Sequence, residues 1–260
     1  MALLEVSGLS LSFGGIRAVQ DLSFRVERGE VHSIIGPNGA GKTSVFNLLT
    51  GFYQPTAGRV LFEGSDVTGQ KPHQLAGRGI SRTFQNLQIC FNMSAVENVM
   101  VGAHLRLDQR MLPAMLHLPS VVRADRACRE EALELMNFVG VGKFAGVDAE
   151  AMPYGALKRL EIARALASRP KLLLLDEPAA GLNQSETREL DELIQKIAQT
   201  SATVVLVEHD MKLVMGLSSR VLVLDHGRKL AEGTPAELRQ DREVIAAYLG
   251  GAHDLEKAPA

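Results

Sequence analysis

Tryptophan is absent from this chain of 260 residues, and cysteine occurs only twice, at Cys90 and Cys128. Two distant cysteines have neither the spacing of a zinc site nor the density of a disulfide-stabilised domain, so we assign them no chemistry. No stretch approaches eighteen apolar residues and no apolar segment follows a charged N-terminus, which predicts a soluble chain that is not exported. The formal net charge is −2, and no basic face predicts a nucleic acid partner.

The pattern with the most chemical content is the run Gly36-Pro37-Asn38-Gly39-Ala40-Gly41-Lys42-Thr43, followed by Ser44. An apolar strand at 31–35 precedes it and a short helix follows it, which is the context that phosphate-binding loops require. Glycines let successive N–H groups turn toward a phosphate at the helix N-terminus. Lys42 would reach the β- and γ-phosphates, and Thr43 would bind Mg²⁺. The run therefore predicts a nucleoside triphosphate site.

A second pattern consists of two acidic residues after four consecutive leucines at 172–175, and these leucines indicate a buried strand. Asp176 and Glu177 come directly after them, and the carboxyl ends of parallel strands are where ligands bind in such sheets. Asp176 would hold Mg²⁺ through its water shell, and Glu177 would polarise the water that attacks the γ-phosphate. The alternative is a solvated turn, which we disfavour because the acids complete the set needed for phosphoryl transfer.

Apolar periodicity predicts the other elements. Strands are expected at 9–13, 22–26, 59–62, 171–175 and 203–207, and helices at 43–50, 130–138, 155–168, 186–199 and 235–249. The return of strand–helix alternation after residue 155 favours a parallel sheet in an α/β fold. Asn183 and Glu186 have the spacing of a capping box, and Asp225-His226-Gly227 predicts a hairpin turn. The segment 105–118 carries Leu107, Met111, Leu112, Met115 and Leu116, which we interpret as core, with a partner-facing stripe as the alternative.

Further motifs follow in a fixed order. They are Thr83-Phe84-Gln85-Asn86, Met152-Pro153-Tyr154-Gly155, the strand and acids at 172–178, and Val207-Glu208-His209-Asp210. With the phosphate loop, they make the whole chain resemble the ATPase subunits of ABC transporters. The resemblance implies that Gln85 joins the nucleotide site to the helical region and contacts Mg²⁺, that His209 reaches the γ-phosphate, and that Phe13 stacks on adenine.

The same resemblance implies a P-loop NTPase fold with a RecA-like core, an N-terminal antiparallel β subdomain and an inserted helical subdomain. Residues 1–84 would form the nucleotide-binding core with the β subdomain and phosphate loop, and 85–152 the helical subdomain. Residues 153–234 would form the second part of the core, and 235–260 a helical tail.

A finer resemblance is to the LivG-type subunits of importers for branched-chain amino acids. It rests on five phrases, which are 79–85, 97–99, 160–166, 178–183 and 231–235 with 247–250. Such subunits bind ATP and Mg²⁺ and dimerise head to tail, so that Tyr154 and Gly155 would contact the nucleotide of a second, related ATPase. The resemblance further implies membrane permeases, an external substrate-binding protein and a location on the cytoplasmic face of the inner membrane.

The signature segment departs from the usual family pattern. Pro153 removes a hydroxyl and an N–H that many relatives have. Ala156 and Leu157 stand where the pattern has polar residues, with glutamine at the second position. We therefore expect an asymmetric pair of sites, in which the site completed by this signature hydrolyses ATP more slowly.

Other functions are less well supported. A lipopolysaccharide-type ABC exporter resembles this architecture most closely. Soluble ABC ATPases of translation or DNA repair have tandem ATPase domains or a long coiled-coil insertion, which this chain lacks. A phosphate-loop kinase would not need the signature-like motif or His209. The transported substrate and the choice between homodimer and heterodimer stay open, with urea, short amides and aromatic acids as alternative cargoes.

Overall fold

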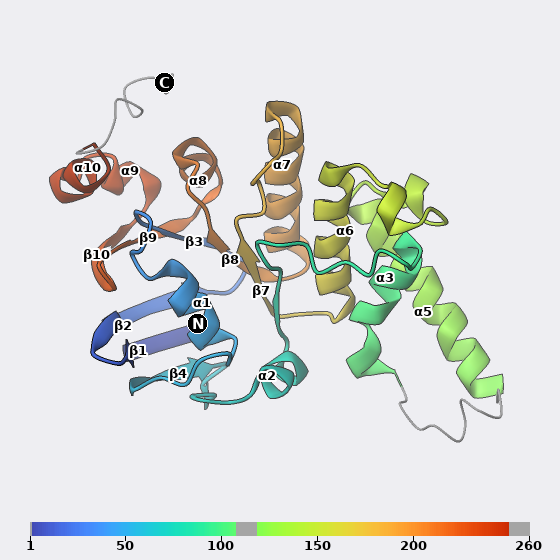
Figure 1. The fold of residues 1–260 in the computed structure, drawn as a ribbon, viewed down its shortest axis with the longest axis horizontal. Helices are drawn as coiled ribbons and strands as arrows, with labels where there is room; N and C mark the ends of the chain where they lie inside the picture. The colour runs from blue at the N-terminus through green and yellow to red at the C-terminus, as the bar shows by residue number, and fades with distance from the viewer. Residues whose placement is uncertain (1, 108–118, 250–260) are drawn as a thin grey trace.

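The computed structural model describes residues 2–107 and 119–249 as two sheets with flanking helices (Figure 1). The strands are β1 (Ala2–Phe13), β2 (Ile16–Glu27), β3 (Val31–Ile35), β4 (Ala57–Phe62), β5 (Ser65–Asp66), β6 (Ile80–Arg82), β7 (Leu172–Asp176), β8 (Thr203–Val207), β9 (Arg220–Asp225) and β10 (Arg228–Gly233). The helices are α1 (Lys42–Leu49), α2 (Pro72–Arg78), α3 (Ala95–Gly102), α5 (Pro119–Phe138), α6 (Tyr154–Ala167), α7 (Gln184–Thr200), α8 (Met211–Leu217), α9 (Pro235–Leu238) and α10 (Arg242–Leu249), with short 3₁₀ turns η1 (His104–Arg106), η2 (Gly142–Phe144) and η3 (Ala149–Ala151).

An antiparallel sheet of order β2-β1-β4-β5 forms the N-terminal part. Its first two strands join at Gly14 and Gly15, whose φ angles of 49° and 95° suit a tight turn. Buried apolar side chains alternate with exposed ones along β2, as in any strand with one face in a core. The strands predicted at 9–13 and 22–26 are therefore present but longer than expected, because their polar residues lie on the solvent side.

The second sheet has the order β10-β9-β3-β8-β7-β6, and all its neighbours are parallel except the β9–β10 hairpin. Strands β3, β7 and β8 are buried along their whole length, which explains their nearly continuous apolar sequences. Leu172 and Leu174 pack toward α1 and the antiparallel sheet, whereas Leu173 and Leu175 pack toward α6 and α7. The phosphate-loop helix α1 thus lies between the two sheets, near the carboxyl ends of β3 and β7 (Figure 1).

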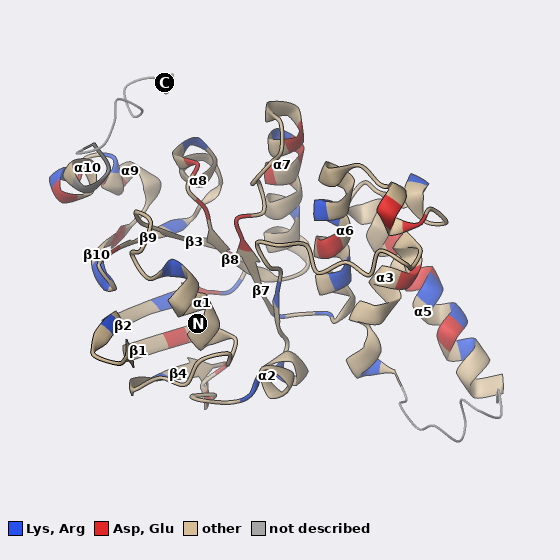
Figure 2. Ribbon diagram, viewed as in Figure 1, with Lys and Arg blue, Asp and Glu red and all other residues tan. Residues whose placement is uncertain are grey.

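Helices α3 and α5 lie at one end of the molecule, beside α6 (Figure 1). The helix predicted at 130–138 is the second half of α5, which begins at Pro119. Arg residues are interspersed with Asp and Glu along α5 (Figure 2), and apolar periodicity therefore did not predict the first turns of the helix. Of the apolar stripe predicted at 105–118, Leu107 packs partly buried against the core, and Met111, Leu112, Met115 and Leu116 lie outside the described residues.

The C-terminal part confirms one prediction and corrects another. Strands β9 and β10 pair antiparallel around the predicted turn, where His226 and Gly227 have positive φ angles. The single helix predicted at 235–249 is wrong, because the chain forms two helices, α9 and α10. Asp241 Oδ1 accepts hydrogen bonds from the backbone N–H groups of Glu243 (2.8 Å) and Val244 (3.3 Å). This cap starts a new helix instead of continuing the first.

Candidate functional site

The phosphate loop connects β3 to α1 and fits closely against its surroundings. Gly39 and Gly41 adopt φ angles of 82° and 102°, which only glycine adopts without strain. A Cβ on Gly41 would lie 2.6 Å from the carbonyl oxygen of Ala18, and one on Gly36 would lie 2.4 Å from that of Leu224. Close backbone contacts with β2 and β9 thus require glycine at 41 and 36, and the positive φ angle alone favours it at 39.

A cavity of about 590 Å³ opens at this loop. The residues that line it come from the phosphate loop and the start of α1 (38–44), from β2 (Ile16, Arg17, Ala18 and Gln20) and from the β9–β10 hairpin (His226 and Gly227), together with Glu177. The structure therefore brings Glu177 to the phosphate loop, as the sequence predicts. Phe13 is not part of this lining; it is 45% exposed and packs edge-to-face against Tyr53 at a centroid distance of 5.1 Å.

Lys42 is buried at the first turn of α1, and its ammonium group is held by the loop itself. Nζ donates to the carbonyl oxygens of Gly36 (2.7 Å) and Pro37 (3.1 Å). Burial lowers the pKa of Lys42, while the negative charges of Glu177 and Asp176 act in the opposite direction. The two carboxylates are therefore close enough to Lys42 to interact with its positive charge.

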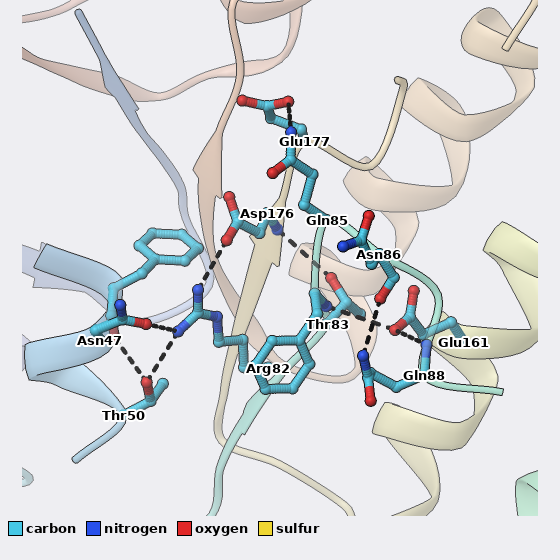
Figure 3. Close-up of polar contacts among 12 residues, drawn as sticks. Asn47, Thr50, Arg82, Thr83, Gln85, Asn86, Gln88, Glu161, Asp176 and Glu177 are labelled. Carbon is cyan, nitrogen blue, oxygen red and sulfur yellow. Dashed lines mark hydrogen bonds and ion pairs between the residues drawn. The ribbon is translucent and has the colours of Figure 1, made fainter. Parts of the chain in front are cut away.

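The acids at the end of β7 have different surroundings (Figure 3). Asp176 is buried and forms an ion pair with Arg82. Glu177 has a φ angle of 47°, and its N–H donates to the carbonyl of Val207 at 2.9 Å. Gln85 Nε2 donates to Glu177 Oε2 at 3.0 Å. The structure thus joins Gln85 to Glu177 directly. Glu177 itself has a backbone conformation that few residues besides glycine adopt.

The oxygen donors available here suit Mg²⁺. Thr43 is exposed in the cavity lining. Asp176 and Gln85 do not line the cavity, but Asp176 acts electrostatically on Lys42 and Gln85 is bonded to Glu177, and both of these partners do line it. Within residues 2–107 and 119–249, no group of three His, Cys, Asp or Glu side chains is arranged to hold a metal alone. A hydroxyl, a carboxylate and an amide oxygen are ligand types that fit Mg²⁺, which usually keeps several waters and combines one or two protein ligands with phosphate oxygens.

The switch histidine and the signature segment do not line this cavity. The His209 side chain is 66% exposed in the loop before α8 and does not line the cavity. Tyr154 is exposed at the N-terminus of α6, with Gly155 next to it. Leu157, which replaces the expected glutamine, is buried in the core. Tyr154 and Gly155 therefore do not line the cavity at the phosphate loop of their own chain.

Two buried glutamates connect the site's loops, and sequence reasoning missed both. Glu161 on α6 accepts hydrogen bonds from the backbone N–H groups of Phe84 and Gln88, so it holds the segment that carries Gln85. Glu208 accepts one from the N–H of Ala179, in the loop after Glu177. Burial raises the pKa of both carboxyls. In the sequence, each of these glutamates directly follows an apolar residue, and this was the only signal that could have indicated a buried carboxylate.

Asp191 on α7 lies close enough to Glu208 and Asp210 for their charges to affect its pKa, and this effect can be tested. Burial, with the charges of Asp210 and Glu208, raises its pKa from 3.8 to about 6. Because the folded chain binds the proton more tightly, its free energy of unfolding falls as pH rises from about 4 to 6. Asp191→Asn removes this penalty and is expected to raise Tm by roughly 1–3 °C at pH 8 but not at pH 4.5.

Differential scanning calorimetry at the two pH values measures this effect. Glu130→Gln, at an exposed position on α5, is the control and should change Tm by less than about 1 °C. An equal gain for Asp191→Asn at both pH values would contradict the raised pKa.

Comparison with known proteins identifies the class. Residues 19–180 match the family model described as ABC transporter, and this range includes the phosphate loop, Asp176 and Glu177. The chain therefore belongs to the ABC transporter family, as a subunit that binds and hydrolyses ATP. Residues 228–254 match a second model, described as branched-chain amino acid ATP-binding cassette transporter, which places the chain among the LivG- and BraF-type members.

The curated relatives agree with this placement. BraF of Pseudomonas aeruginosa, a high-affinity branched-chain amino acid transport ATP-binding protein, is 47% identical over 96% of this chain and 98% of its own length. LivG of Escherichia coli strain K12, which has the same description, is 44% identical with the same coverage. LptB of that strain, from a lipopolysaccharide export system, is 32% identical over 96% of this chain and 98% of its own length.

Solved structures confirm the fold predicted from the sequence. An ADP-bound ATP-binding cassette of an ABC transporter superposes with a TM-score of 0.84 at 29% identity, over 96% of this chain and 99% of that chain. A nucleotide-free cassette gives 0.83 at 28% identity, over 96% and 100%. A dimeric cassette bound to ADP and Pi gives 0.75 at 24% identity, over 89% and 98%, which shows the shared fold.

Proposed function

We propose that this chain powers the uptake of branched-chain amino acids as an ATPase subunit of an importer. The match of residues 228–254 to the model of branched-chain amino acid cassettes carries the choice of cargo. The identity to BraF and LivG supports it, and the lower identity to LptB makes the exporter the weaker candidate. Urea, short amides and aromatic acids are the alternative cargoes.

The proposed ATP site is the cavity at the phosphate loop. Backbone N–H groups of 38–44 would bind the β- and γ-phosphates at the N-terminus of α1. Lys42 would exchange its bonds to the carbonyls of Gly36 and Pro37 for charge-assisted bonds to phosphate oxygens. Phe13, which is exposed at the end of β1 outside the cavity lining, would stack on adenine, and Ile16 and Arg17 would contact the nucleotide from β2.

The proposed general base is Glu177. Its carboxylate lies in the cavity lining and would take the proton of the attacking water, while Gln85, bonded to the same carboxylate, would help to orient that water. Thr43, Asp176 and Gln85 would hold Mg²⁺, which would neutralise phosphate charge when bound. Catalysis would then consist of positioning and charge stabilisation.

The cavity of one chain is open, and we propose that a second ATPase subunit completes it. Tyr154, exposed at the N-terminus of α6, and Gly155, buried next to it, would face the partner's nucleotide, and His209 would reach the γ-phosphate when the dimer closes. Leu157 supports the proposed asymmetry, because a buried leucine cannot supply the polar contact of a glutamine. Equal loss of ATPase activity on disabling the glutamate of either subunit would contradict that asymmetry.

The proposed assembly also contains two membrane permeases and receives cargo from an external binding protein. Among the helices in the described ranges, none combines the length and apolar character needed to cross a bilayer. Contact with the membrane would therefore be made through the permeases, on the cytoplasmic face of the inner membrane. Affinity purification of the tagged chain from detergent-extracted membranes, followed by mass spectrometry, should recover the permeases and the second ATPase.

Uptake measurements test the cargo. Deleting the gene for this chain in its native host is expected to lower high-affinity uptake of radiolabelled leucine by about tenfold or more, since transport needs ATP hydrolysis. The wild-type gene should restore uptake, and a Glu177→Gln copy should not. Unchanged uptake of leucine, isoleucine and valine, with loss of uptake of urea or an amide, would contradict the proposed cargo but not the ATPase.

A further inference from the structure

Arg82, at the end of β6, is a buried cation that the function described so far does not use. Its guanidinium donates from Nη2 to Asp176 Oδ2 at 2.8 Å, and both side chains are almost fully buried, with 6% and 7% of their surface exposed. Asp176 is the carboxylate proposed to hold Mg²⁺. One of its two oxygens is therefore already engaged by a positive charge (Figure 3).

Several further contacts fix the guanidinium in place. Nη1 donates to Asn47 Oδ1 at 2.6 Å and to Thr50 Oγ1 at 3.2 Å, both at the C-terminal end of α1. The rings of Phe46 and Phe84 lie 5.4 and 4.9 Å from Cζ, within the range of cation–π attraction. An arginine held by these groups cannot swing away when a metal ion approaches Asp176.

We propose that Arg82 is a positioning residue that orients Asp176 and lowers the affinity of the nucleotide site for Mg²⁺. The inference rests on the proposed magnesium site. A fixed positive charge beside the carboxylate reduces its attraction for a second cation, most strongly where little water screens the charges. It also keeps Asp176 oriented when no nucleotide is bound, because a buried carboxylate without a partner is strongly destabilising.

Neutral variants separate the two effects of this charge. Arg82→Met removes the charge and leaves Asp176 unpaired, so the nucleotide-free chain is expected to lose roughly 5 °C or more in Tm. In the presence of ADP, the MgCl₂ concentration that gives half of the maximal rise in Tm should fall about threefold or more, because no positive charge then neutralises the carboxylate that binds Mg²⁺. Arg82→Lys keeps the charge and should stay within about twofold of wild type in this midpoint.

The experiment uses the purified full-length chain at a fixed, saturating ADP concentration, with thermal unfolding followed across a MgCl₂ series. Arg106→Met is the matched control, because Arg106 is also fixed by a carboxylate, that of Glu131, and a backbone carbonyl, that of Ala167. It lies outside the lining of the nucleotide cavity. It should lower Tm without moving the MgCl₂ midpoint.

The outcomes are distinct. A midpoint for Arg82→Met that equals or exceeds that of wild type would overturn the inference and leave Arg82 a purely structural ion pair. If Arg82→Met does not fold, Arg82→Gln, which is neutral but retains an amide donor, is measured and judged in the same way. Absence of any Mg²⁺ effect in the wild-type chain with ADP would overturn the proposed magnesium site itself, and this inference with it.

Discussion

Glu177→Gln is expected to lower ATP turnover by about a hundredfold or more and to leave ATP affinity within about threefold. Glutamine fills the same space and accepts the hydrogen bond that Gln85 donates to Glu177, so the cavity keeps its shape. It cannot take a proton from the attacking water, and general-base catalysis is lost. Turnover is measured as phosphate release by the assembled transporter, and affinity with a fluorescent ATP analogue on the purified chain.

Glu192→Gln is the matched control for this variant. It makes the same chemical change on the exposed side of α7, so turnover and affinity should both stay within about twofold. A Glu177→Gln transporter that retains a third of wild-type turnover would show that another group takes the proton. Loss of affinity together with turnover would instead mean that Glu177 holds the loop in shape.

Lys42→Ala is expected to weaken ATP binding by about a hundredfold, which corresponds to roughly 2.7 kcal/mol. The substitution removes the ammonium that is held at Gly36 and Pro37 within the phosphate loop. It also removes the positive charge that interacts with the carboxylates of Asp176 and Glu177. Nucleotide affinity of the purified chain, measured by equilibrium dialysis or fluorescence, checks the result.

Lys143→Ala is the control for the loss of a lysine. Lys143 lies in η2, where Nζ is placed over the ring of Phe144, and it is not part of the cavity lining. Its affinity for ATP should stay within about twofold of wild type. Near-normal binding by Lys42→Ala would mean that the backbone N–H groups alone bind the phosphates, and the role assigned to Lys42 would be wrong.

Local signals predicted much of this molecule. The phosphate loop, the acids at the end of β7 and the β9–β10 turn all depend on residues adjacent in sequence. The capping box at Asn183 is also local, and its side chain accepts hydrogen bonds from the N–H groups of Ser185 and Glu186 at 2.9 and 3.0 Å. Where a few neighbouring residues determine backbone geometry, the sequence alone is sufficient.

Long-range contacts account for what was missed. The Arg82–Asp176 pair joins residues 94 positions apart, and no periodicity marks a partner at that distance. Strand β6 has only three residues and was not predicted, because it lies at the edge of its sheet and, in the part of the chain that the structure describes, pairs with β7 alone. The helix break at Asp241 depends on one side-chain cap, which apolar periodicity does not detect.

The backbone contacts around the phosphate loop have a consequence for the order of events during protein synthesis. Gln20 N–H donates to the carbonyl of Gly227 at 2.8 Å, and Gly227 N–H donates to that of Ala40 at 2.9 Å. A nascent chain emerges from the ribosome N-terminus first, so the loop appears long before the hairpin that closes its cavity. A growing chain that ends before residue 226 therefore lacks one wall of its nucleotide pocket, and tight ATP binding should begin only when nearly the whole protein has been made.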